Sequence, residues 1–107
     1  MKDIPEVVSA YFVADQANNV DALNQIFSDS AIVEDNGSLY RGIVEICTWL
    51  LTMKEKYQYS LEIIEVSNTN HISTVLTQGS GNFPNSPVKL TFQFTLENGK
   101  VVKLRIY

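Results

Sequence analysis

The second half of the chain alternates between apolar and polar residues, and this alternation constrains the fold more than any other feature of the sequence. The clearest run is residues 88–97, where Val, Leu, Phe, Phe and Leu are separated by single polar residues. Because successive side chains of a strand point to opposite faces of a sheet, this run predicts a strand with one buried and one solvated face. Asn98 and Gly99 accept positive φ angles, so they predict a tight hairpin that leads to a last strand over residues 102–107.

Two further strands are predicted ahead of this hairpin. Residues 57–63 alternate in one phase, and Ile64 and Val66 continue in the opposite phase, a change that a bulge in a bent sheet produces. Residues 71–80 form the next strand, and residues 81–87 form a loop because they are rich in Gly, Pro, Asn and Ser. The chain from residue 57 onward therefore predicts an antiparallel meander without a helix.

The first half of the chain has the periodicity of helices. A first helix follows Asp3, which can form a capping box with Glu6, and it continues to the break at Asn18-Asn19. A shorter helix begins at residue 20 and ends by residues 29–30, and a third helix follows residues 41–42. These apolar stripes predict three helices, each with one buried face.

A strand and a hairpin interrupt the helices. Residues 31–35 alternate, Asn36-Gly37 suits a tight turn, and residues 38–40 form the return strand. Helices that precede a meander must cover one face of its sheet, since only that arrangement buries both sets of apolar side chains. The fold class predicted from the residues is therefore α+β.

Composition excludes several classes of function. A chain of 107 residues predicts one domain over residues 1–107, and a net charge of −4 leaves no basic surface for nucleic acid or acidic membranes. No apolar run reaches the roughly 20 residues of a membrane helix. The single Cys47 cannot form an internal disulfide, and the N-terminus lacks the pattern of a signal peptide, so we expect a cytoplasmic protein.

Nothing in the sequence indicates a metal or a cofactor. His71 is the one histidine and has no nearby cysteine, so a metal site is not predicted. No glycine-rich phosphate loop is present, and no nucleophile elbow supports a Ser-His-Asp triad. We therefore expect no cofactor. Cys47 is predicted to be a small core residue of the third helix.

Three stretches of the chain resemble a known family. They are residues 20–35, which end in Val33-Glu34-Asp35; residues 40–49, which join Tyr40-Arg41-Gly42 to Trp49; and residues 81–101. Together they resemble the SnoaL-like branch of the nuclear transport factor 2-like superfamily over almost the whole chain. The resemblance implies a cone-shaped fold, with three N-terminal helices packed on a strongly curved antiparallel sheet around a pocket for a small apolar molecule. It also implies a homodimer formed through the outer face of the sheet.

Within that superfamily the residues look most similar to the ketosteroid isomerases. Those enzymes carry a tyrosine on the inner face of the first helix and a general-base aspartate at the end of the first strand, and Tyr11 and Asp35 occupy these positions here. The resemblance implies that Asp35 removes a proton and that Tyr11 donates a hydrogen bond to the resulting enolate. A protonated aspartate completes the site in those enzymes, and Phe92 stands in its place in this chain.

Each of these residues also has a structural interpretation. Asp35 shares a strand face with Ala31 and Val33, so burial would raise its pKa and make it a usable base, but it can also cap the Asn36-Gly37 turn at the surface. Tyr11 can be a core tyrosine. Glu34 points to the opposite face from Asp35, which argues against a paired-carboxylate mechanism. Five aromatic residues are predicted either to line a ligand pocket or to fill the core: Trp49, Tyr59, Phe83, Phe92 and Phe94.

Two functional hypotheses remain open from the sequence. The first is a cofactor-free isomerase-like or cyclase-like enzyme that uses Asp35 and Tyr11. The second is a non-catalytic domain that binds a hydrophobic ligand or serves in dimerisation. The superfamily contains both kinds of protein, because fold does not fix chemistry.

Overall fold

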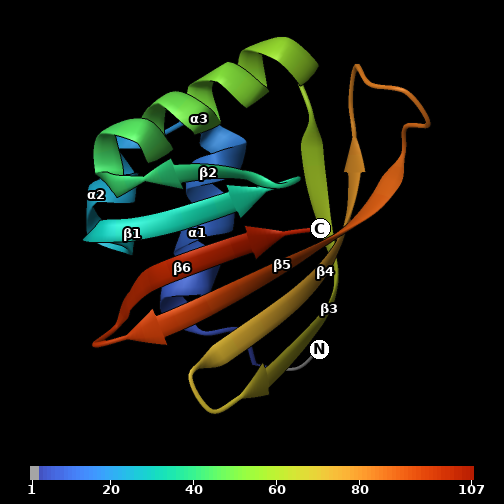
Figure 1. Cartoon of the computed structure of the whole chain (residues 1–107). Coiled ribbons are helices and arrows are strands. Elements are labelled where there is room, and N and C mark those ends of the chain that lie inside the picture. The colour runs from blue at the N-terminus through green and yellow to red at the C-terminus, as the bar shows by residue number, and fades with distance from the viewer. Residues whose placement is uncertain (1–2) are drawn as a thin grey trace.

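The computed structural model describes residues 3–107 and has the element order expected from the sequence, in which a strand hairpin precedes the last helix and a meander of strands follows it (Figure 1). The helical elements are α1 (Glu6–Ala17), the short 3₁₀ helix η1 (Val20–Ala22), α2 (Leu23–Ile26) and α3 (Gly42–Tyr57). The strands are β1 (Phe27–Asp35), β2 (Ser38–Arg41), β3 (Ser60–Thr69), β4 (Ile72–Ser80), β5 (Val88–Glu97) and β6 (Lys100–Ile106). The α+β prediction is confirmed.

Within residues 3–107 the strands form one six-stranded sheet in the order β2-β1-β6-β5-β4-β3. All neighbouring pairs are antiparallel except β1 and β6, which run parallel, so the sheet is mixed and not purely antiparallel as expected. The two parallel strands are far apart in the chain, and no hairpin between them imposes an antiparallel direction. α3 packs against β1 and β2, and α1 contacts β3 and β6.

The predicted turns and the predicted bulge are present. Asn36 and Gly37 have φ angles of 51° and 86°, and Asn98 and Gly99 have φ angles of 53° and 75°, as tight hairpins require. The register of β3 on β4 shifts between Ile63 and Glu65, where the apolar phase changes in the sequence. The sheet twists and bends along its strands (Figure 1).

Two boundaries in the N-terminal part of the chain differ from the sequence-based expectation. α1 begins at Glu6 with Pro5 at the N-cap and without a side-chain hydrogen bond there, so the predicted capping box of Asp3 and Glu6 is absent from the described residues. The second helical segment ends at Ile26, and β1 already begins at Phe27 because Phe27 pairs with Val101 of β6. None of the helices in the described part of the chain combines the length and hydropathy needed to span a bilayer.

Candidate functional site

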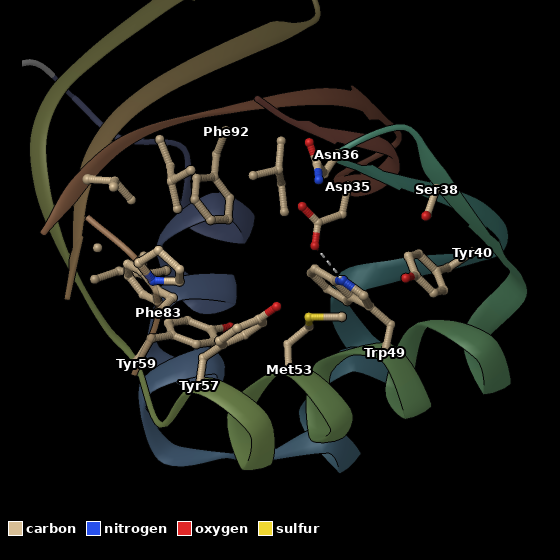
Figure 2. A pocket seen from close by; sticks show the side chains of 16 residues that line it. Asp35, Asn36, Ser38, Tyr40, Trp49, Met53, Tyr57, Tyr59, Phe83 and Phe92 are labelled. Atoms are coloured by element: carbon tan, nitrogen blue, oxygen red, sulfur yellow. Dashed lines mark hydrogen bonds between the residues drawn. The ribbon is translucent and has the colours of Figure 1, made fainter. Parts of the chain in front are cut away.

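A cavity of about 430 Å³ opens between α3, the β1–β2 hairpin, the start of β3, the end of β4 and the start of β5. Figure 2 shows side chains from these elements converging on it. Its apolar wall includes Met53, Leu61, Pro84, Val88, Leu90 and Ile106. Its aromatic wall consists of Tyr40, Trp49, Tyr57, Tyr59, Phe83 and Phe92. Asp35, Asn36 and Ser38 contribute the polar edge, and the lining residues include no Lys, Arg or His.

Asp35 faces this cavity from the last position of β1. It shares the inward face of the strand with Ala31 and Val33, which are both fully buried. The indole Nε1–H of Trp49 donates a hydrogen bond to Asp35 Oδ2 at 3.0 Å (Figure 2). Among residues 3–107, neither ion pair involves Asp35, and no hydrogen bond reaches Oδ1. The carboxylate therefore faces the cavity with one oxygen held and the other available to a ligand.

The neighbouring carboxylate lies outside this site. Glu34 Oε2 approaches Arg105 Nε of β6 at 3.6 Å, and the Glu34 side chain is 30% exposed. Its position follows from the alternation of the strand, which turns Glu34 to the face opposite Asp35. The two carboxylates are thus not a catalytic pair.

Tyr11 lies in the core and does not line the cavity. Its hydroxyl donates to Asp15 Oδ2 at 3.1 Å, one helical turn further along α1. Burial, together with the nearby Asp15, raises the pKa of the Tyr11 hydroxyl well above its ordinary value. The hydroxyl hydrogen is therefore retained and already used within the protein, which does not favour the expected contact with an enolate.

Asp15 is the centre of a buried polar network beneath the cavity. Tyr59, which does line the cavity, donates to the same Asp15 Oδ2 at 2.9 Å, and Lys54 Nζ pairs with Asp15 Oδ1 at 3.0 Å. Lys54 also donates to the Tyr59 carbonyl at 3.1 Å and lies 4.2 Å from the Tyr59 ring centroid. Burial and Asp15 also raise the pKa of Tyr59 far above its ordinary value. The sequence signal for this network was a charged residue, Asp15, placed four residues after Tyr11 on a buried stripe.

Of the five aromatic residues predicted to line a pocket or fill the core, some line the cavity and one lies in the core. Trp49, Tyr59, Phe83 and Phe92 line the cavity, whereas Phe94 is fully buried and is not among the lining residues. Phe94 instead packs against Tyr11 at a ring-centroid distance of 5.5 Å, because its position in β5 faces α1. It belongs to the hydrophobic core.

Tyr57 is a cavity residue that the sequence analysis assigned to a strand. It is the last residue of α3, and its ring meets Phe83 edge-on at a centroid distance of 5.9 Å. No hydrogen bond of its hydroxyl is formed within residues 3–107. Figure 2 shows Tyr57 entering the cavity from the side opposite Asp35. Its hydroxyl is thus a free donor that can reach a ligand.

Solved structures with the same fold were found by comparison, whereas no protein-family model and no curated protein sequence matches the chain. A candidate polyketide cyclase from Sinorhizobium meliloti is 38% identical, covers 98% of this chain and 96% of its own, and superposes with a TM-score of 0.95. A ketosteroid isomerase-like protein from Catenulispora acidiphila, solved in complex with trimethylamine, is 17% identical with a TM-score of 0.85 over 98% of this chain and 86% of its own. A SnoaL-like candidate polyketide cyclase from Jannaschia is 16% identical with a TM-score of 0.84, and the match covers 100% of this chain and 90% of that protein. The identity and coverage of the Sinorhizobium relative show that this chain belongs to the SnoaL-like branch of the nuclear transport factor 2-like superfamily.

Proposed function

We propose that this protein is a cofactor-free enzyme of the isomerase or cyclase type, in which Asp35 removes a proton next to a carbonyl group of a small apolar substrate. The observation that carries the proposal is the Asp35 carboxylate itself. It faces an aromatic cavity, has no cationic partner among residues 3–107, and has one oxygen fixed by Trp49. A base held in one orientation, with its second oxygen open to the cavity, supports a role in general-base catalysis.

The proton transfer can be written with its atoms balanced. Asp35 Oδ1 takes the proton from the carbon next to the substrate carbonyl, and the electron pair of that C–H bond moves onto the carbonyl oxygen to give an enolate. In an isomerase, Asp35 returns the proton to another carbon of the conjugated system. In a cyclase, the enolate carbon attacks a second carbonyl of the same molecule, and the new alkoxide takes up the proton held by Asp35, which restores the carboxylate.

The enolate oxygen needs a hydrogen-bond donor, and we assign this role to Tyr57. Its hydroxyl enters the cavity opposite Asp35, whereas the hydroxyl hydrogens of Tyr11 and Tyr59 are both donated to Asp15. Removing one such donor from an oxyanion site typically slows the reaction by about 100- to 1,000-fold. Tyr11 then has a supporting function, because it shares Asp15 with the cavity residue Tyr59.

Exchange of carbonyl α-protons in D₂O, followed by NMR over steroid, polyketide-like and terpenoid ketones, tests the elementary step. We expect catalysed exchange by the wild type and its loss in Asp35→Asn. Glu34→Gln is the matched control, since it removes the adjacent carboxylate on the opposite face of β1 and should leave exchange unchanged. Equal exchange by Asp35→Asn and the wild type would refute the assignment of the base.

A second pair of variants tests the oxyanion donor. Tyr57→Phe should slow exchange by about 100-fold, while Tyr40→Phe, which removes another cavity hydroxyl, serves as its control. Slow exchange by Tyr40→Phe, together with unchanged exchange by Tyr57→Phe, would instead assign the oxyanion donor to Tyr40 of the β1–β2 hairpin.

A binding protein without chemistry is the second candidate function. It is supported by the Catenulispora relative, which was solved with a small molecule, trimethylamine, bound to it. The two functions differ in one observable. A binder changes the fluorescence of Trp49, the one tryptophan of the chain, when a ligand enters the cavity, yet exchanges no proton on any ketone.

A further inference from the structure

We infer that the cavity also binds small methylated ammonium ions, with Asp35 as their counter-ion and the surrounding aromatic rings as their cage. This inference goes beyond the proposed catalysis, because it requires the charge and shape of the cavity but no proton transfer. The chemistry that recognises such ions is a carboxylate combined with aromatic faces.

The charge of the cavity is negative and uncompensated. Asp35 lines it without an ion pair, and the lining residues include no Lys, Arg or His. Two cations of the neighbouring elements are already paired within the described chain, Lys54 with Asp15 and Arg105 with Glu34. A third, Lys56, lies 5.1 Å from the ring centroid of Tyr57 but is not among the residues that line the cavity. A cationic ligand would therefore supply the missing partner of Asp35 instead of competing with a protein cation.

The aromatic rings lie next to that charge. The indole N–H of Trp49 is bonded to Asp35, so the ring that gives the strongest cation–π contact adjoins the carboxylate. Tyr40 lies beside Trp49 at a centroid distance of 6.0 Å, and Tyr57 and Phe83 form a second aromatic pair across the cavity. A cation near Asp35 is thus next to the Trp49–Tyr40 pair, with the Tyr57–Phe83 pair on the other side of the cavity.

The form of the ligand follows from the uneven distribution of hydrogen-bond acceptors around the cavity, most of whose lining is apolar or aromatic. A primary ammonium carries three N–H donors, and each must find an oxygen once water is removed. Besides Asp35 Oδ1, the acceptors of Asn36 and Ser38 lie at one edge, and the rest of the lining is mainly aromatic and aliphatic, so the cavity suits a cation whose charge is covered by methyl groups. Tertiary and quaternary ammonium ions meet this condition, because their methyl groups contact the rings.

Choline and its uncharged counterpart of the same shape, 3,3-dimethylbutan-1-ol, test the inference by titration of Trp49 fluorescence and by calorimetry. We expect choline to bind at least about tenfold more tightly than the alcohol, a ratio that corresponds to one charge-specific contact. Asp35→Asn should abolish the preference, and Glu34→Gln should preserve it. Equal binding of the two ligands by the wild type would overturn the inference without any variant, so the result does not depend on how well Asp35→Asn folds.

The outcome is independent of the proposed catalysis. Ketone exchange without selective choline binding would leave the enzyme and remove the cation site. Selective choline binding without exchange would leave the cation site and favour a binding protein. Where both are observed, choline should inhibit exchange competitively, because each ligand needs the free oxygen of Asp35.

Discussion

Replacing Lys54 by Met should destabilise the protein by leaving the carboxylate of Asp15 without its cation. The side chains of Lys54 and Asp15 are 10% and 3% exposed, so water cannot take the place of the ammonium group. Loss of one partner from a buried ion pair typically costs about 3–5 kcal/mol. Asp15 retains the hydrogen bonds from Tyr11 and Tyr59, which stabilise its charge, so we place the expected loss at the lower end, about 3 kcal/mol.

A double substitution separates the charge from the packing. In Asp15→Asn/Lys54→Met no buried charge remains, and the amide oxygen can still accept from the two tyrosines. The double variant should therefore be more stable than Lys54→Met alone, although it carries one more substitution.

Urea unfolding followed by Trp49 fluorescence measures these free energies. Lys56→Met is the matched control, because Lys56 is an exposed residue of the same helical turn, and its loss should change stability by less than about 0.5 kcal/mol. The reasoning is refuted if Lys54→Met costs less than about 1 kcal/mol, or if the loss in the double variant equals the sum of the losses in Lys54→Met and in the single variant Asp15→Asn.

Three further predictions concern the two tyrosines that donate to Asp15, the loop at Gly81 and the oligomeric state. The folded state raises the pKa of Tyr11 and Tyr59 above the unfolded value of about 10. Above that pH the free energy of unfolding should therefore fall by about 1.4 kcal/mol per pH unit for each of the two tyrosines. Urea unfolding near pH 10 and pH 11 checks this, and an equal free energy of unfolding at the two pH values contradicts it. Gly81→Ala should cost about 1–3 kcal/mol, since its new Cβ would lie 2.7 Å from the carbonyl oxygen of Tyr57; Ser80→Ala is its control, and equal melting temperatures of the two variants would contradict it. Light scattering after size exclusion should give twice the mass of 12.0 kDa for the predicted homodimer, and the monomer mass would disprove that prediction.

The strands of the second half could be predicted because their signal is local. Residues 88–97 alternate without an exception, and the structure forms β5 over the same residues. The beginning of β1 could not be read in this way. Residues 27–30 have no alternation, and they are extended because Phe27 pairs with Val101, which is distant in sequence. The parallel pairing of β1 with β6 could not be predicted for the same reason, because the two strands are distant in sequence.

Part of the candidate site also followed from the sequence. The phase of Ala31, Val33 and Asp35 placed the carboxylate on the inward face of β1, and Asp35 does face the cavity. Periodicity shows that a side chain points inward, but it does not distinguish the core from a cavity. That distinction separates Tyr11, which is in the core, from Tyr57, which is in the cavity.

Partners across elements were the least predictable part. The bond between Trp49 and Asp35 joins α3 to β1, and the bond between Tyr59, which directly precedes β3, and Asp15 of α1 spans 44 residues. Such contacts depend on how the helices cross the sheet, which a single sequence does not encode in any local pattern. Their consequence is large, because they determine which oxygens remain free to a ligand.

The indole N–H resonance of Trp49 tests most directly whether Asp35 and Trp49 form one ligand-binding pair, on which both proposals depend. The chain has one tryptophan, so a ¹H–¹⁵N spectrum contains one such signal to follow. We predict that Asp35→Asn shifts it in the absence of ligand, that Glu34→Gln does not, and that choline or an exchanging ketone shifts it on saturation. A signal that stays in place in Asp35→Asn and with every ligand would contradict the account, because neither the hydrogen bond nor the cavity could then be where the function requires them.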